Sequence, residues 1–157
     1  MKTFRFRAAI GSILLLVCAV GVASAQSVFS AKWNVPFSFT VGRAILPPGE
    51  YVIRSSNSSE DWSLLSIQNQ KGPESTYFMV NPFQQSKASE NSKLVFHQYE
   101  NQYFLAQVCI RGEGTGRELP MTKAEREVAR EAKHTPMSQS KIVTVVAENQ
   151  QGKPQLQ

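Results

Sequence analysis

The alternation of apolar and polar positions along the chain predicts short β-strands. From residue 35 to residue 41, branched or aromatic residues alternate with proline and small polar residues (VPFSFTV). A strict period of two with such residues is typical of a half-buried strand. Pro36 cannot donate a ladder hydrogen bond, so it belongs at the start of this strand or on the edge of a sheet.

Further strands are expected where apolar runs lie between turn signals. A hairpin is indicated by the runs 93–99 and 102–110 around Glu100 and Asn101, with Asn101 as the residue that tolerates a left-handed backbone. Its register stays open, because it depends on the loop length. The polar stretch 55–61 predicts a loop, Asn81 and Pro82 are expected to end the fourth strand, and the remaining expected strands are 51–54, 62–68, 76–80 and 141–147.

A single helix is predicted near residues 122–133. Thr122 and Glu125 form a capping box, in which each side chain satisfies a free backbone N–H. Val128 is the only large apolar residue between 123 and 133, so we expect a polar surface helix held at one narrow contact. The preceding RGEGTG segment, 111–116, does not open directly into a helix, as a phosphate loop must, and is expected to be a flexible connector.

Seven or eight short strands and one short polar helix predict an all-β, mainly antiparallel fold. A small sandwich and a small barrel both satisfy this pattern. We expect one β-rich domain at residues 26–147, followed by a polar, Gln-rich, disordered tail at 148–157.

Residues 1–25 have the features of a cleaved secretory signal peptide. Three cationic residues precede an apolar centre at 8–22, and Ala23 and Ala25 give an A-x-A cleavage pattern. A transmembrane anchor needs about 20 apolar residues, and the run here is shorter. A lipoprotein site at Cys18 is disfavoured by the bulky Val17 before it. Cleavage after Ala25 predicts a secreted or periplasmic protein without a membrane span.

Export changes the meaning of the charge and of the cysteines. The 157 residues contain 17 Lys and Arg against 12 Asp and Glu, but removal of residues 1–25 leaves 14 against 12, a net charge of +2. This excess is too small for a nucleic-acid-binding surface. Cys109 loses Cys18 as a partner within the chain, and we expect it to be a buried thiol that packs as a small apolar group. A disulfide-linked dimer through Cys109 is the alternative to a monomer.

The sequence assigns no catalytic residue, cofactor site or metal site. No G-x-S-x-G element is present, Asp61 is the only aspartate, and His134 is expected to be solvated at the helix end. His97 lies in a strand, where a satisfied or half-exposed histidine is more common than a catalytic base. Two histidines and one cysteine are too few for a structural zinc site. His97 and Cys109 therefore stand as speculative site residues only.

Three pairs of sequence blocks resemble a family of small, uncharacterised, secreted bacterial proteins. The likeness covers roughly residues 33–131 and implies an exported β-rich domain, with no established activity, cofactor or catalytic residue. Cys109 departs from the family pattern, which has a bulky aromatic such as Trp there, and this favours a packing role. The blocks are VPFSFTVG (35–42) with LPPGEY (46–51), KLVFHQY (93–99) with YFLAQV (103–108), and GRELP (116–120) with AERE (124–127).

The function expected from these features is that of an exported, non-enzymatic β-domain of the periplasm or cell envelope. Its 13 aromatic residues after cleavage exceed what a core of this size needs, which favours binding of a small apolar ligand or of a protein or envelope partner. The alternative is a hydrolase of an envelope polymer, in which His97 and Glu residues converge in a cleft. A third hypothesis is strand addition to a partner at the edge indicated by Pro36.

Overall fold

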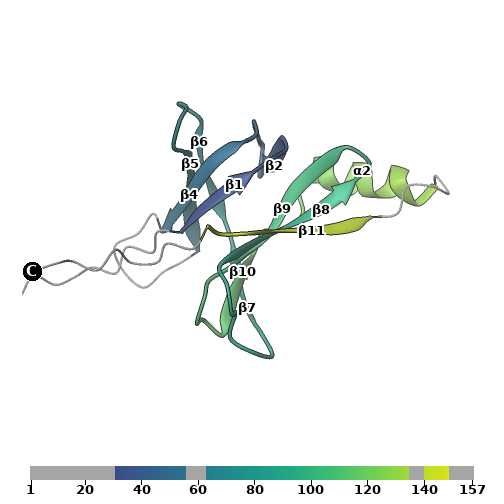
Figure 1. Cartoon of the computed structure of the whole chain (residues 1–157). Helices are drawn as coiled ribbons and strands as arrows, with labels where there is room; N and C mark the ends of the chain where they lie inside the picture. Colours follow the sequence, from purple (N-terminus) through teal and green to yellow (C-terminus); the bar gives the residue numbers. More distant parts are fainter. Residues whose placement is uncertain (1–30, 56–62, 135–139, 149–157) are drawn as a thin grey trace, which may run out of the picture.

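The structure is a computed structural model that describes residues 31–55, 63–134 and 140–148 (Figure 1). The expected signal peptide, the loop 56–61, Trp62 and most of the expected tail lie outside the described residues, as does the side chain of His134. In the described part of the chain, no helix is both long enough and apolar enough to span a membrane.

The described residues form two sheets and one helix, which confirms the all-β, mainly antiparallel prediction in a sandwich-like form (Figure 1). Sheet A has four antiparallel strands, whose spatial order is β1 (Lys32–Val35), β4 (Gly49–Ser55), β5 (Leu64–Asn69) and β6 (Ser75–Met79). In β5, Leu65 and Ile67 are buried while Ser66 and Gln68 are more exposed, because successive side chains of a strand point to opposite faces.

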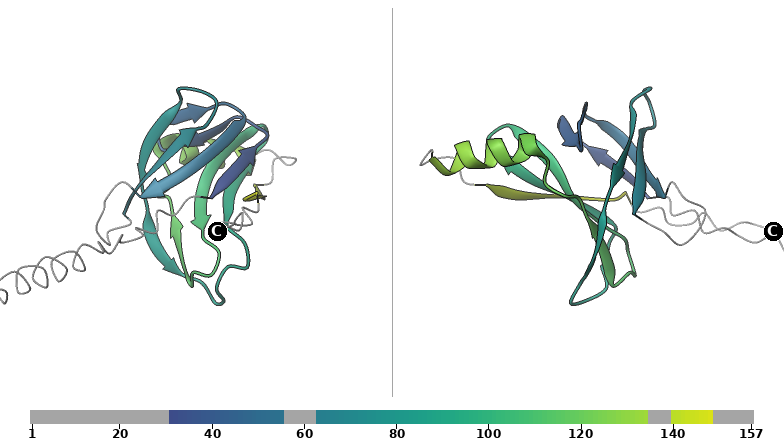
Figure 2. Two further views of the ribbon diagram at one scale, coloured as in Figure 1. Left: turned by 60° about the vertical axis from the view of Figure 1, so that its left-hand side comes forward. Right: turned by 180° about the vertical axis from the view of Figure 1, so that it is seen from behind.

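Sheet B contains seven strands. Five follow one another in the order β11 (Lys141–Val146), β8 (Lys93–Tyr99), β9 (Gln102–Cys109), β10 (Thr115–Glu118) and β7 (Asn81–Gln84). The short β2 (Phe39–Val41) pairs in parallel with β9 and antiparallel with β3 (Ala44–Leu46). The helix α2 (Lys123–His134) lies against the outer face of this sheet, beside β8 and β9 (Figure 2).

The core lies between the two sheets and is filled by aromatic and branched side chains. Phe39 packs edge-on against Tyr51 and Phe96, with ring centroids 5.1 and 5.3 Å apart. The buried Tyr51 hydroxyl donates to the carbonyl oxygen of Pro47 at 2.6 Å, so its polar end is satisfied. The chain passes between the sheets three times, from β1 to β2, from β3 to β4 and from β6 through Val80 to β7. In addition, Lys32 bridges Glu148 just beyond β11.

Several predicted elements differ from the structure. The single strand predicted over 35–41 is wrong, because β1 and β2 belong to different sheets and residues 36–38 connect them. The alternation of apolar residues is real, since Val35 and Phe39 both enter the shared core. The fourth strand ends before Asn81, as expected, since β6 stops at Met79. Asn81 and Pro82 do not form a turn, however, but begin β7, an edge strand of the other sheet, where a residue without an N–H is tolerated.

The hairpin at 93–109 is confirmed, with two details that the sequence left open or placed wrongly. A register shift between Val95 and Phe96 marks a β-bulge in the pairing of β8 with β9. The left-handed residue of the turn is Glu100, with φ of 52°, rather than Asn101.

The segment expected to be a flexible connector is partly ordered as β10. A Cβ at Gly116 would lie 2.4 Å from Cζ of Phe83 in the neighbouring strand, so only glycine fits this close approach. β10, the unpredicted β3 and β7, and the division of the first expected strand into β1 and β2 raise the count in the described residues to eleven strands rather than seven or eight.

Candidate functional site

His97 and Glu125 meet where the start of α2 crosses β8. Nδ1 of His97 and Oε1 of Glu125 are 2.8 Å apart, and the Glu125 side chain is only 6% exposed. Thr122 caps the helix as expected, because its hydroxyl accepts the N–H of Glu125 at 3.1 Å. The Glu125 carboxylate does not complete the capping box: its hydrogen bond goes to His97, so it fixes the helix to the sheet.

The rest of the helix contact is narrow and apolar, as the sequence predicted. Val128 and Ala129 pack with the buried Ala132 against Tyr99 and Phe104, whose ring centroids are 5.9 Å apart. Burial raises the pKa of the Tyr99 phenol above its ordinary value, and the Glu125 carboxylate acts in the same direction.

The hydrolase alternative requires His97 and a glutamate to converge in a cleft, and the structure meets half of that condition. Glu125 contacts His97, but neither residue lines the groove described below. Among the described residues, no serine, threonine or cysteine side chain hydrogen-bonds the His97 ring. This geometry assigns the pair a role in docking the helix.

Cys109 is 2% exposed and lies opposite Lys93 in the β8–β9 ladder, so it occupies the buried position that the sequence favoured. Burial raises the pKa of the Cys109 thiol, which lowers its thiolate fraction and its reactivity. The described residues contain no group of three or more His, Cys, Asp or Glu side chains placed to hold a metal ion.

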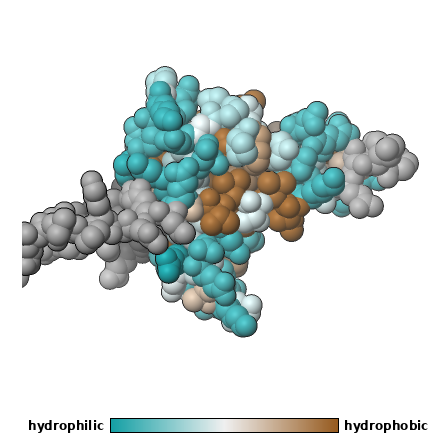
Figure 3. Space-filling model, viewed as in Figure 1, coloured by the Kyte–Doolittle hydropathy of each residue, from teal (hydrophilic) through white to brown (hydrophobic). Residues whose placement is uncertain are grey.

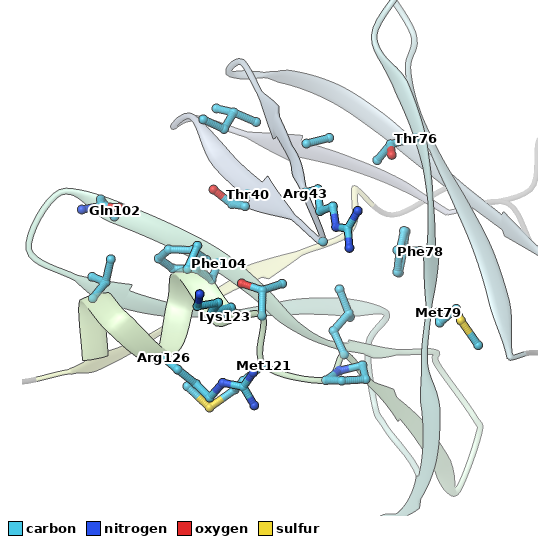
Figure 4. A pocket seen from close by; sticks show the side chains of 18 of the residues that line it. Thr40, Arg43, Thr76, Phe78, Met79, Gln102, Phe104, Met121, Lys123 and Arg126 are labelled. Atoms are coloured by element: carbon cyan, nitrogen blue, oxygen red, sulfur yellow. The ribbon is translucent and has the colours of Figure 1, made fainter. Parts of the chain in front are cut away.

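A groove of about 1290 Å³ lies between four separate parts of the chain. They are the β2–β3 hairpin (residues 40 and 42–45), β6 (residues 76–79), Gln102 and Phe104 of β9, and the segment before α2 with the first turns of that helix (residues 119–124 and 126–128) (Figure 4). Seen from behind, α2 and β6 stand on opposite sides of this space, with the hairpin between them (Figure 2). The fold therefore builds the groove from segments far apart in sequence.

Exposed apolar residues border the groove, although Met79 directs its side chain to the face of β6 opposite the buried Phe78 (Figure 4). The exposed fraction is 77% for Ile45, 67% for Tyr77, 69% for Met79 and 40% for Met121. Isolated exposed apolar residues are ordinary, but several gathered in one hollow mark a contact surface.

The charged side chains of the groove are mainly cationic. Arg43 extends from the hairpin on one side, and Lys123 and Arg126 lie on the helix side (Figure 4). The one acidic lining residue, Glu127, is 4.0 Å from Lys123 and partly offsets it. In the described part of the chain, neither Arg43 nor Arg126 forms an ion pair. The groove therefore carries two uncompensated positive charges.

Sequence reasoning did not find this groove, and it singled out His97 and Cys109 instead. One signal was available in STYFM at 75–79, where Phe78 on one face and Tyr77 and Met79 on the other are all apolar. A strand with one solvated face has polar residues at alternate positions. No comparable signal marks Ile45, whose strand is three residues long.

Comparison with known proteins adds no assignment: no protein-family model, curated protein or solved structure matches the chain. The likeness to a family of secreted bacterial β-domains stays a prediction.

Proposed function

We propose that this chain is an exported, non-enzymatic binding domain of the periplasm or cell envelope, and that the groove is its binding site. The observation that carries the proposal is that four exposed apolar residues, Ile45, Tyr77, Met79 and Met121, border one groove. Export is supported by the positive, apolar and A-x-A segments of residues 1–25.

The energetic argument is the burial of apolar surface. Covering apolar area releases about 25 cal/mol per Å², and a single large side chain contributes about 1.5–3 kcal/mol when fully buried. Three of the four side chains keep more than two thirds of their surface in water, so an apolar occupant gains free energy in proportion to the part of that surface it covers. The two uncompensated arginines favour an occupant that also carries negative charge.

The test is an NMR titration of the mature protein, residues 26–157, with 8-anilinonaphthalene-1-sulfonate, a small apolar anion. We expect saturable shifts of the amide signals of residues 42–45, 76–79 and 119–128. Met79→Ser should weaken binding several-fold. The matched control is Ile142→Ser, which removes a similarly exposed apolar side chain from β11; the exposed fraction of Ile142 is 73%. Figure 3 shows a hydrophobic area over β11. Shifts confined to β11, or equal loss in both variants, would contradict the proposal.

A further inference from the structure

The groove is bounded by the unpaired edges of two strands. Hydrogen-bonded neighbours run from β6 through β5, β4 and β1, across the Lys32–Glu148 bridge to β11, and on through β8, β9 and β2 to β3. In the described part of the chain, β3 pairs only with β2, and β6 pairs within sheet A only with β5. The ring of strands is therefore open between β3 and β6, where the groove lies (Figure 4).

Consecutive residues of both strands line this opening. Side chains of successive strand residues point to opposite faces, so a surface that touches every residue from 76 to 79 borders the edge of β6 rather than one face. The same holds for residues 43–45 at the β3 edge.

The hydrogen-bond pattern shows which backbone groups of β6 point into the groove. Val80 N–H donates to the Ser63 carbonyl and Asn69 N–H donates to the Glu74 carbonyl, both at 2.8 Å and both in register with the β5–β6 ladder. Bonded and non-bonded pairs alternate in an antiparallel ladder, so the backbone groups of Tyr77 point away from β5, as do those of residue 79. The Tyr77 carbonyl accepts only a long hydrogen bond, 3.4 Å, from the Thr76 hydroxyl.

The β3 edge follows the same rule. Val41 and Ala44 pair across a two-residue turn that contains Gly42, with φ of 60°, so their bonded pair closes the hairpin. Ile45, the next residue, therefore directs its N–H and carbonyl away from β2 and toward the groove. Its partner Thr40 correspondingly pairs with Phe104 of β9 on the other side.

We propose that the groove binds an extended, acidic polypeptide segment, which adds as a strand to the edge of β6 and lays its side chains beside those of β6, alternately on the Phe78 face and on the Tyr77 and Met79 face. The inference rests on the proposed function and names the class of partner. Strand addition uses main-chain hydrogen bonds for affinity and alternate side chains for specificity. Arg43 and Arg126 supply the complementary charge.

Two further observations favour a peptide over a small ligand. The volume of about 1290 Å³ exceeds the roughly 300–1,000 Å³ that is usual for small-molecule pockets. Natural edge strands are protected by proline or charge, as Pro82 protects β7, whereas Ser75–Met79 and Ala44–Leu46 contain neither.

The test uses 12-residue peptides selected from a random display library on the mature protein, and one binder synthesised with a fluorescent label. Fluorescence anisotropy then compares wild type with two variants at one position. Tyr77→Pro removes the outward N–H without removing a bond to β5 and should weaken binding about tenfold or more, whereas Tyr77→Val keeps the N–H and should cost no more than about threefold. Cross-strand NOEs from the peptide to residues 77 and 79 are expected.

The matched control is Thr144→Pro on β11, an edge strand that does not border the groove. Ala147 N–H donates to the Ser92 carbonyl in register with the β8–β11 ladder, so the N–H of residue 144 also points outward. We expect this variant to bind as wild type, and Arg43→Glu to bind about tenfold more weakly.

Equal binding by Tyr77→Pro and wild type, or loss in Thr144→Pro, would overturn the strand-addition proposal. So would a failure to select any peptide while 8-anilinonaphthalene-1-sulfonate still titrates the groove, and in that case the proposed function survives. If neither probe perturbs the groove, both proposals fail.

Discussion

The contact between His97 and Glu125 predicts that removing either side chain lowers the unfolding free energy, and that the two single mutants do so by different amounts. An ionised carboxylate only accepts hydrogen bonds, so Nδ1–H of His97 donates to Glu125 across 2.8 Å. The two partners differ in exposure: the side chain of Glu125 is 6% exposed and that of His97 is 35% exposed. Removing one partner therefore leaves a buried carboxylate in one case and a ring that water can reach in the other.

The magnitudes follow from that difference. His97→Ala leaves a buried charged acceptor without its donor and should cost about 2–3 kcal/mol of unfolding free energy. Glu125→Ala removes the acceptor and a first-turn acid, while water replaces the lost bond at His97, so about 1 kcal/mol is expected. The double mutant leaves no orphaned group and should cost about 2 kcal/mol, so the coupling energy is about 1–2 kcal/mol.

The assay is urea unfolding of the mature protein at neutral pH, followed by far-UV circular dichroism and by tryptophan fluorescence. Arg130→Ala, on an exposed position of the same helix, is the control and should change stability by less than about 0.5 kcal/mol. Single-mutant costs that add within about 0.3 kcal/mol would refute the coupling. A smaller cost for His97→Ala than for Glu125→Ala would refute the role of burial.

Three further predictions concern positions away from α2. Gly116→Ala should destabilise by about 1–3 kcal/mol in the same assay because its Cβ meets the Phe83 ring, whereas Gly114→Ala, whose nearest neighbouring atom is 3.6 Å away, should be close to neutral. Cys109 should be alkylated by iodoacetamide much faster in urea than in the native state and should give a monomer band without reductant; the disulfide alternative predicts a dimer band. Burial raises the pKa of Tyr51 above 10.0, because the folded state disfavours the ionised phenolate. The neutral phenol therefore contributes fully to the unfolding free energy below pH 10, and this contribution is lost as the pH rises through the folded-state pKa. Tyr51→Phe should flatten that alkaline decline in unfolding free energy.

The sequence predicted those parts of the fold whose signal is local. The 93–109 hairpin has two long apolar runs around a short turn, and the helix has a polar cap at Thr122 followed by strong helix formers. Both lie where expected. The errors came where tertiary pairing overrides local pattern: Pro82 lies in the new strand β7 because that strand is on an edge, and β10 forms in a glycine-rich segment because Phe83 packs over Gly116.

The candidate site was harder to foresee because its residues share no stretch of chain. Tyr77 and Met121 come from different layers, and only the splaying of the two sheets brings them to one hollow. His97 drew attention because histidine is chemically versatile, yet its neighbour Glu125 became identifiable only from the crossing of α2 over β8. Here the consecutive apolar residues Tyr77, Phe78 and Met79, which give β6 an apolar side chain on both faces, were a better sequence marker of the site than the titratable residues were.

The edge strands show why the sequence pointed to another edge for strand addition than the pairing of the strands does. Pro36 does follow an edge strand, since β1 is the outermost strand of sheet A, but Lys32 of that strand already meets Glu148. Proline marks an edge strand that cannot form a full ladder of hydrogen bonds with a further strand. The residues that identify an edge in the sequence are therefore those that prevent strand addition there. An edge available for pairing has no such residue: β6 reads in sequence as an ordinary strand, and β3 was not predicted as a strand at all. The open edge is therefore found only from the pairing map, by asking which outward N–H and carbonyl groups have no strand beside them.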